Sequence, residues 1–150
     1  MSGQTERCAE CGAALKNGGA CIDHFHLILG WELTEQLYDV HHLAVLSYFL
    51  QHPALYSPEG LPSAIGQLVD FVEHGVTPQQ MRQRIAAAVD SGTRSYRIAG
   101  TPAHHGAYAH VVTWQVRVDD VVRAGVERYY ASVQRWAASI LDSLRQSGNL

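Results

Sequence analysis

Residues 21–53 read CIDHFHLILGWELTEQLYDVHHLAVLSYFLQHP and contain two successive helical patterns. Apolar side chains recur at helical spacing over 21–33 and again, every three or four positions, over 35–51. Thr34 is suited to cap the second helix, and Pro53 ends it because proline has no amide hydrogen to donate. The stretch therefore predicts two antiparallel helices joined near Thr34.

The rest of the chain predicts further helices. Residues 21–90 hold four shorter helices in all, because Ser63 can cap a third and Thr77-Pro78 supplies the cap and first residue of a fourth. An almost uninterrupted apolar stripe predicts a long last helix over 119–146. We expect a mainly α fold of about five helices in an irregular bundle, forming a single domain over residues 1–150.

The stretch 91–117 interrupts the helical patterns. It is rich in Gly, Pro, His and Tyr, and it is too polar for a core helix. A wholly structureless loop of this length is unusual in a domain. We therefore expect a long loop or a small hairpin, with 96–98 and 110–114 as the best candidates for strands.

Three cysteines provide the strongest chemical signal. Cys8-x-x-Cys11 is followed by Cys21, and the intervening residues are rich in glycine. A C-x-x-C turn brings two thiolates about one tetrahedral edge apart, and an odd cysteine count favours a histidine as the fourth ligand. Residues 7–21 are thus predicted to form a metal knuckle that binds a structural ion, Zn²⁺ being the expected one. Two exposed thiols with a buried one are a weaker interpretation. A redox C-x-x-C is weaker still, because such a motif usually opens a helix after a strand, and no strand precedes Cys8.

The fourth ligand is predicted from the pairing of the two helices. In an antiparallel pair joined near Thr34, Cys21 faces roughly Tyr48, and His52 lies one turn further along, at the end where the knuckle must dock. His52 is therefore the favoured ligand. His24 is the alternative, because it follows Cys21 at C-x-x-H spacing.

Other polar residues of the two helices could line a pocket. His41 and His52 are eleven residues apart, about 16 Å along a helix, so they cannot share one ion. A second site in the middle of the bundle would draw on His41, His42, Tyr48, His26 and Glu32. The interpretation we favour is that these histidines are hydrogen-bonded residues of a packed core.

The loop contains a third group of histidines. His104, His105 and His110, together with Tyr108, could cover such a pocket or supply ligands to it. A flexible polar loop is the interpretation we favour, since no spacing here is diagnostic.

The sequence resembles an uncharacterised bacterial family, domain of unknown function 5946. The resemblance rests on Cys8-Ala9-Glu10-Cys11-Gly12, the lone Cys21 before Phe25, Glu32, and His41-x-Leu43-x-Val45-x-x-Tyr48-x-x-Gln51-His52-Pro53. Members often carry an acid at the position of Leu46 and a histidine near Tyr129 or Tyr130, and this chain has neither. Because the family has no assigned reaction, the resemblance supports the site and implies no activity.

The composition limits which binding partners and which cellular compartment we expect. The net charge is −3, with Lys16 the only lysine and ten dispersed arginines, so we expect neither nucleic acid nor an anionic membrane as a partner. No run approaches the roughly 20 apolar residues of a membrane span, and residues 1–7 do not read as a signal peptide. We therefore expect a cytoplasmic protein.

The function indicated by these patterns is a zinc-stabilised helical domain that binds a small molecule or a protein. No phosphate loop, nucleophile elbow or metalloprotease helix is present in the sequence. One alternative is a metal-dependent hydrolase that uses His41, His42 and a histidine of 104–110 around an ion with an open water position. Another is an adaptor that forms a homodimer through an exposed apolar face of its last helix.

Overall fold

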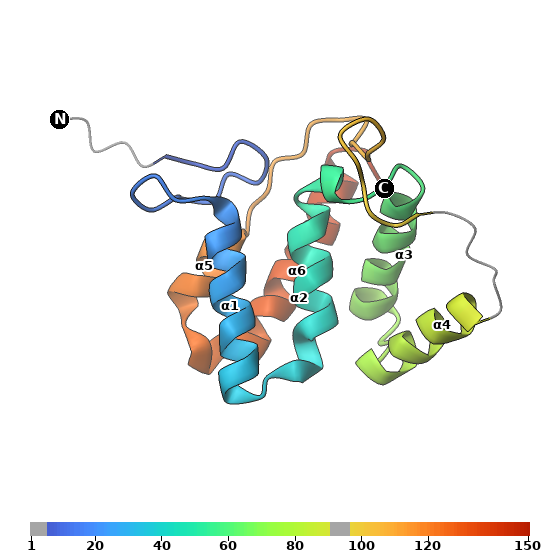
Figure 1. Cartoon of the computed structure of the whole chain (residues 1–150), viewed down its shortest axis with the longest axis horizontal. Helices are drawn as coiled ribbons and strands as arrows, with labels where there is room; N and C mark the ends of the chain where they lie inside the picture. Colours follow the sequence, from blue (N-terminus) through green and yellow to red (C-terminus); the bar gives the residue numbers. More distant parts are fainter. Residues whose placement is uncertain (1–5, 91–96) are drawn as a thin grey trace.

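The structure is a computed structural model that describes residues 6–90 and 97–150, and it is mainly helical (Figure 1). These residues form six α-helices and isolated β-bridges, with no named strand. The helices are α1 (Cys21–Glu35), α2 (His41–Leu50), α3 (Gly60–Glu73), α4 (Pro78–Asp90), α5 (Val118–Ala124) and α6 (Tyr129–Gln146). The predicted mainly α fold with a cysteine-rich N-terminal segment is confirmed.

The helices are arranged in two layers (Figure 1). The first three lie side by side in front, and α5 and α6 lie behind them. Helix α6 contacts both α2 and α3, and α5 contacts α1. The core between the layers contains the fully buried side chains of Trp136, Ile28, Leu50, Leu68 and Ile140. The apolar stripe of the last helix thus faces the interior of the bundle.

The connection between α1 and α2 differs from the predicted turn at Thr34. Helix α1 continues through Thr34 and ends at Glu35, and the next residue, Gln36, adopts a left-handed conformation with φ 56°. A short 3-10 turn over Tyr38–Val40 then leads into α2. Thr34 does not cap a helix because the preceding residues continue the hydrogen-bonding pattern of α1 past it.

The start of α4 agrees with the sequence prediction, whereas the start of α3 does not. Helix α3 starts at Gly60, so Ser63 lies inside its first turn and the predicted cap is wrong. Gly60 is buried against the carbonyl of Ile98, where a side chain would have no room. At α4, the Thr77 hydroxyl accepts a hydrogen bond from the amide of Gln80 at 3.1 Å, and the predicted start at Pro78 is confirmed.

The predicted helix over 119–146 is divided into two. Gly125 has φ 90°, outside helical geometry, and a 3-10 turn over Val126–Arg128 separates α5 from α6. Glycine tolerates this conformation without a steric penalty. The break lets α5 lie against α1 while α6 contacts α2 and α3.

Residues 97–117 form a loop without the predicted hairpin. Part of the first proposed strand lies outside the described residues, and 110–114 form no strand. Ala99 instead forms a bridge with Tyr56, and the amide of Gly100 donates to the carbonyl of Leu55 at 3.0 Å. The loop is therefore held by the segment between α2 and α3. None of the helices within 6–90 and 97–150 is long and apolar enough to cross a membrane.

Candidate metal centre

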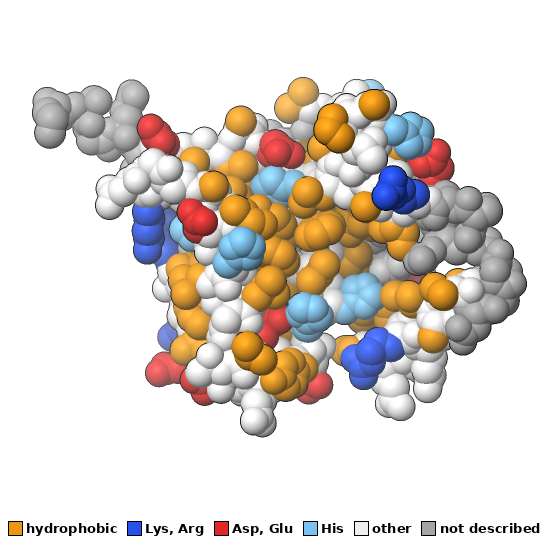
Figure 2. Space-filling view, viewed as in Figure 1, with side chains coloured by type: hydrophobic (Ala, Val, Ile, Leu, Met, Phe, Trp, Pro, Cys, Tyr) orange, Lys and Arg blue, Asp and Glu red, His pale blue; other side chains and the backbone are white. Residues whose placement is uncertain are grey.

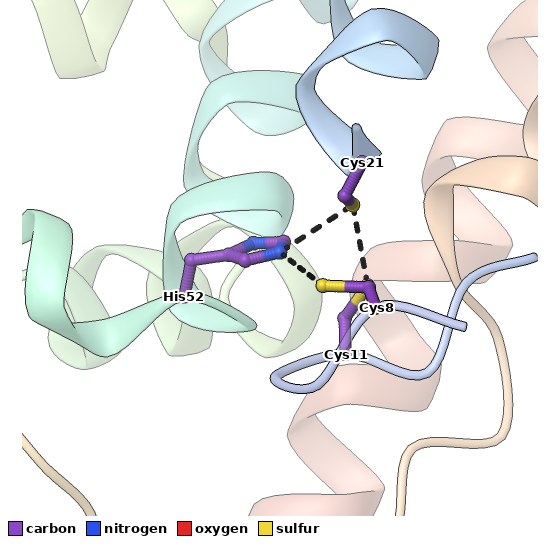
Figure 3. A group of neighbouring side chains, drawn as sticks. All are labelled: Cys8, Cys11, Cys21 and His52. Carbon is purple, nitrogen blue, oxygen red and sulfur yellow. Dashed lines mark hydrogen bonds between the residues drawn. The ribbon is translucent and has the colours of Figure 1, made fainter. Parts of the chain in front are cut away.

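Four side chains from three segments meet at one end of the α1–α2 pair. They belong to Cys8, Cys11, Cys21 and His52, and their ligand atoms all lie within 4.8 Å of one another (Figure 3). The Sγ atoms of Cys11 and Cys21 are 3.4 Å apart, and Nε2 of His52 lies 3.6 Å from Cys8 Sγ and 3.5 Å from Cys21 Sγ. This is a Cys3His group that could hold a metal ion.

The knuckle is shaped by a tight turn after Cys8. The amide of Gly12 donates to the carbonyl of Cys8 at 2.9 Å, and the amide of Cys8 donates to the carbonyl of Ala13 at 2.8 Å. Gly12 has φ 83°, a left-handed conformation that favours glycine. The amide of Ala13 points at Cys11 Sγ from 3.4 Å. One backbone amide thus donates to a sulfur that a cation would hold as thiolate.

Helix geometry brings Cys21 and His52 together. Cys21 is the first residue of α1, and His52 follows the end of α2. Gln36 and Leu37 are midway between them in the sequence, and the chain reverses there. The observed turn therefore accounts for the pairing better than the predicted turn at Thr34.

Tyr48 orients the imidazole of His52. Its carbonyl accepts a hydrogen bond from His52 Nδ1 at 2.7 Å, and the other ring nitrogen, Nε2, is directed at the sulfurs. Its ring stacks on that of His52 with 4.2 Å between ring centroids, and Phe25 stacks on its other side at the same separation. A carbonyl partner on the far nitrogen is typical of a metal-binding histidine.

The cluster is enclosed, and this changes the acidity of its members. Cys11, Cys21 and His52 are buried, and Cys8 is partly exposed. The hydrogen bond to Cys21 and burial raise the pKa of the Cys11 thiol to about 12. Burial alone would lower the pKa of His52, but hydrogen bonds with Cys11 and the Tyr48 carbonyl raise it to about 9. A bound cation would oppose both effects, because it favours thiolates and a neutral imidazole.

His24, the alternative ligand, fixes the knuckle from outside the cluster. Its Nε2 is 2.6 Å from the carbonyl of Ala14, and its side chain is buried. The amide of the same Ala14 donates to Asp119 Oδ2 at 3.1 Å. Helix α1 and helix α5 thus hold one knuckle residue between them.

Two residues that the sequence patterns did not associate with the site support it. Besides Asp119, Arg117 donates from Nε to the carbonyl of Cys11 at 2.9 Å. A Cβ atom on Gly12 would lie 3.0 Å from that Nε. More than 100 residues separate these partners, so no local spacing could have indicated them.

Four of the five residues of the predicted pocket are divided between two places, the metal centre and the surroundings of His41. Tyr48 belongs to the metal centre, and His26 is exposed on α1. His41 and Glu32 form a hydrogen bond of 2.6 Å, and His42 Nε2 is 3.0 Å from Gln67 Oε1. The described residues contain no second group of ligands around these histidines that could hold a metal ion.

The loop histidines are not part of either place. His104 forms an ion pair with Glu59 at 3.1 Å, and His105 Nδ1 is 3.1 Å from the carbonyl of Gly106. At His110, the backbone exchanges hydrogen bonds with the side chain of Asn149. Among the described residues, these histidines do not line the pocket that contains His41, so the alternative of a lid gains no support from that lining.

The fold and the cluster together define a small helical domain with a Cys3His group that could hold a metal ion. The model of a family of unknown function, DUF5946, matches residues 6–145, and the chain belongs to this family. The resemblance noted in the sequence is confirmed. No curated protein and no solved structure gives a match to the chain.

Proposed function

We propose that Cys8, Cys11, Cys21 and His52 bind one Zn²⁺ ion. The observation that carries this proposal is the set of separations between the four ligand atoms. Tetrahedral zinc, with Zn–S bonds of about 2.3 Å and Zn–N bonds of about 2.0 Å, places two sulfurs about 3.8 Å apart and a sulfur and a nitrogen about 3.6 Å apart. In the structure, two sulfurs are 3.4 Å apart and the sulfur-to-nitrogen distances are 3.5 and 3.6 Å, close to these values.

In this proposal the zinc is structural. Four protein ligands close the tetrahedron and leave no position for water, which a catalytic ion would need. The ligands come from the knuckle, from α1 and from the end of α2. Zinc binding therefore contributes free energy of folding by joining three segments. The biochemical role of the domain is then to bind a small molecule or a protein in a reducing, cytoplasmic environment.

The hydrolase alternative has weaker support. It needs His41 and His42 to converge with a histidine of 104–110, yet the described residues around His41 do not include one. The adaptor alternative needs an exposed apolar face on α6, whereas Val133, Trp136, Ile140 and Leu144 are completely buried. The negative net charge argues against nucleic acid as a partner.

Metal analysis of the purified chain tests the proposal. We expect one zinc per chain in the wild type and less than one in Cys21→Ser. His26→Ala, which changes an exposed histidine of the same helix, is the matched control and should retain its zinc. Replacement by Co²⁺ should give the thiolate-to-metal absorption of a tetrahedral sulfur-rich site. A chain that binds no metal after reconstitution under reducing conditions would contradict the proposal.

A further inference from the structure

A second buried polar cluster lies at the other end of the α1–α2 pair. Glu32 is only 3% exposed, and its two carboxylate oxygens have different partners. Oε1 is 2.6 Å from His41 Nδ1, and Oε2 accepts a hydrogen bond from the hydroxyl of Tyr129. Burial and this carboxylate raise the pKa of Tyr129, so its hydroxyl remains a donor. The cluster joins α1, α2 and α6.

The carboxylate determines which nitrogen of His41 is available. Because a carboxylate oxygen accepts, His41 Nδ1 donates to Glu32, and this contact fixes the ring with Nε2 on the side away from the carboxylate. The His41 side chain is 54% exposed, so Nε2 is not required to satisfy a core partner. A buried carboxylate that orients a solvent-accessible imidazole is an arrangement that positions a base or a hydrogen-bond acceptor.

A purely structural role gives a poor account of this cluster. Burying a carboxylate costs free energy that its partners repay only in part, and an apolar residue of similar size would pack at that position without this cost. His41 itself gains little from burial because more than half of its side chain is exposed. The geometry is better explained by a ligand that uses Nε2.

His41 faces a cavity that could hold such a ligand. The cavity has a volume of about 430 Å³, and it is lined by Tyr38, His41, His42, Val45 and Arg82. This size falls within the range of small-molecule sites. On the face drawn in Figure 2, histidine side chains gather over the lower half of α2, beside a basic side chain at the near end of α4. The cavity therefore combines apolar walls with nitrogen groups.

The charge of the cavity favours an anion. Arg82 forms no ion pair with an acid in the described part of the chain, whereas Arg84, on the same helix, is bound to Asp70 at 2.9 Å. Burial, His41 and Arg82 all lower the pKa of His42, whose hydrogen bond to Gln67 partly offsets them. The positive potential that disfavours a charged His42 would attract an oxyanion.

We propose that this cavity binds a small-molecule oxyanion that also carries a hydroxyl group, such as a phosphate ester or a hydroxy acid. The guanidinium of Arg82 holds the anionic oxygens, since a planar guanidinium suits phosphate and carboxylate. The hydroxyl forms a hydrogen bond with Nε2 of His41, whose ring Glu32 holds in place. The inference names the ligand class for the proposed binding role, and it does not depend on the metal.

Inorganic phosphate is the probe for this site, because its protonated forms near neutral pH offer both anionic oxygens and a hydroxyl. It is titrated into the full-length metal-loaded chain at constant ionic strength, and the ring ¹⁵N resonances of His41 are followed by NMR. We expect a saturable shift of Nε2 in the millimolar range. Arg82→Gln should weaken binding about tenfold through loss of charge-assisted hydrogen bonds. Arg84→Gln, outside the cavity on the same helix, should change it less than twofold.

A second variant tests the orienting role of Glu32. Glu32→Gln should weaken phosphate binding and change the ring ¹⁵N resonances of His41, while Glu35→Gln, an exposed control on α1, should do neither. Absence of a saturable shift, or equal weakening by Arg82→Gln and Arg84→Gln, would overturn the proposal. Zinc content measured on the same samples separates the two proposals, since phosphate can fail to bind while the metal stays in place.

Discussion

The α1–α2 pair has a polar cluster at each end, and the two clusters differ in what their members can still contact. At the cysteine end, His52 turns Nε2 toward two sulfurs, and its other nitrogen is bonded to the Tyr48 carbonyl. At the opposite end, His41 is bonded to Glu32 through Nδ1, and its exposed side chain lines a cavity. Within the described residues, His52 makes contacts through both ring nitrogens, whereas the contact of His41 is through Nδ1.

This difference shows how one helix pair can separate stability from recognition. A metal at the cysteine end would join the knuckle, which contains no named strand or helix, to α1 and the end of α2, so its binding free energy would go into folding. The Glu32 cluster connects helices that already pack through a common core, and it adds an oriented group at the surface. Three substitutions and one change of pH test this difference between the two clusters.

The largest effect is expected from removing a ligand of the metal centre. His52→Ala should lose the metal and lower the free energy of unfolding by about 4 kcal/mol, which corresponds to a decrease in Tm of roughly 10 °C or more. Thermal melts of His52→Ala and of the exposed control His26→Ala measure this. A strong chelator should reduce the Tm of the wild type by a similar amount, and a chelator without effect would count against a structural metal.

A smaller effect is expected at the other end of the helix pair. Glu32→Gln keeps the shape of the side chain but replaces a charged acceptor of two hydrogen bonds by an amide. We expect a loss of about 2 kcal/mol in chemical denaturation, since a buried polar group is left with a poorer partner. The metal content should stay at the wild-type value, and Glu35→Gln should be neutral. Loss of metal from Glu32→Gln would show that the two clusters are not independent.

The variant His24→Ala tests whether His24 positions the knuckle or binds the metal. His24→Ala removes the hydrogen bond to Ala14 but none of the four ligand atoms. We expect one metal per chain with an affinity about tenfold lower, as is usual when an orienting partner is removed. Competition with a chromophoric chelator measures the change. If His24→Ala abolished metal binding as completely as His52→Ala, His24 would be a ligand.

The sequence was sufficient to predict the parts of the site that follow from local spacing. The C-x-x-C turn and the antiparallel helices predicted that Cys8, Cys11, Cys21 and His52 would meet, and the structure brings them together. The predicted turn at Thr34 was wrong, but the predicted pairing of Cys21 with His52 did not depend on it, because the observed reversal at Gln36 gives the same pairing.

Other parts depend on contacts between distant residues that have no local pattern. Arg117 and Asp119 contact the knuckle from more than 100 residues away, and Tyr129 bonds to Glu32 across 97. The break at Gly125 could not be predicted from the apolar stripe, which continues through it in the sequence. Only the packing of α5 against α1 shows why the chain turns there.

The smallest effect concerns the pH dependence of stability through His42. Burial lowers the pKa of His42 below its usual 6.5, with His41 and Arg82 acting in the same direction. The unfolded chain therefore takes up a proton at this residue before the folded chain does. Its contribution to stability is complete above pH 6.5 and is lost as the pH falls toward the lowered value.

We therefore expect the wild type to lose more stability than His42→Gln on acidification from about pH 8 to about pH 5.5. Denaturation of both proteins at each pH gives the difference, in which the proton dependence of metal binding cancels. His26→Gln should follow the wild type over the same range. A larger loss in His42→Gln would mean that His42 is stabilised in its charged form, and the cavity would then present a cation at that position instead of a neutral ring.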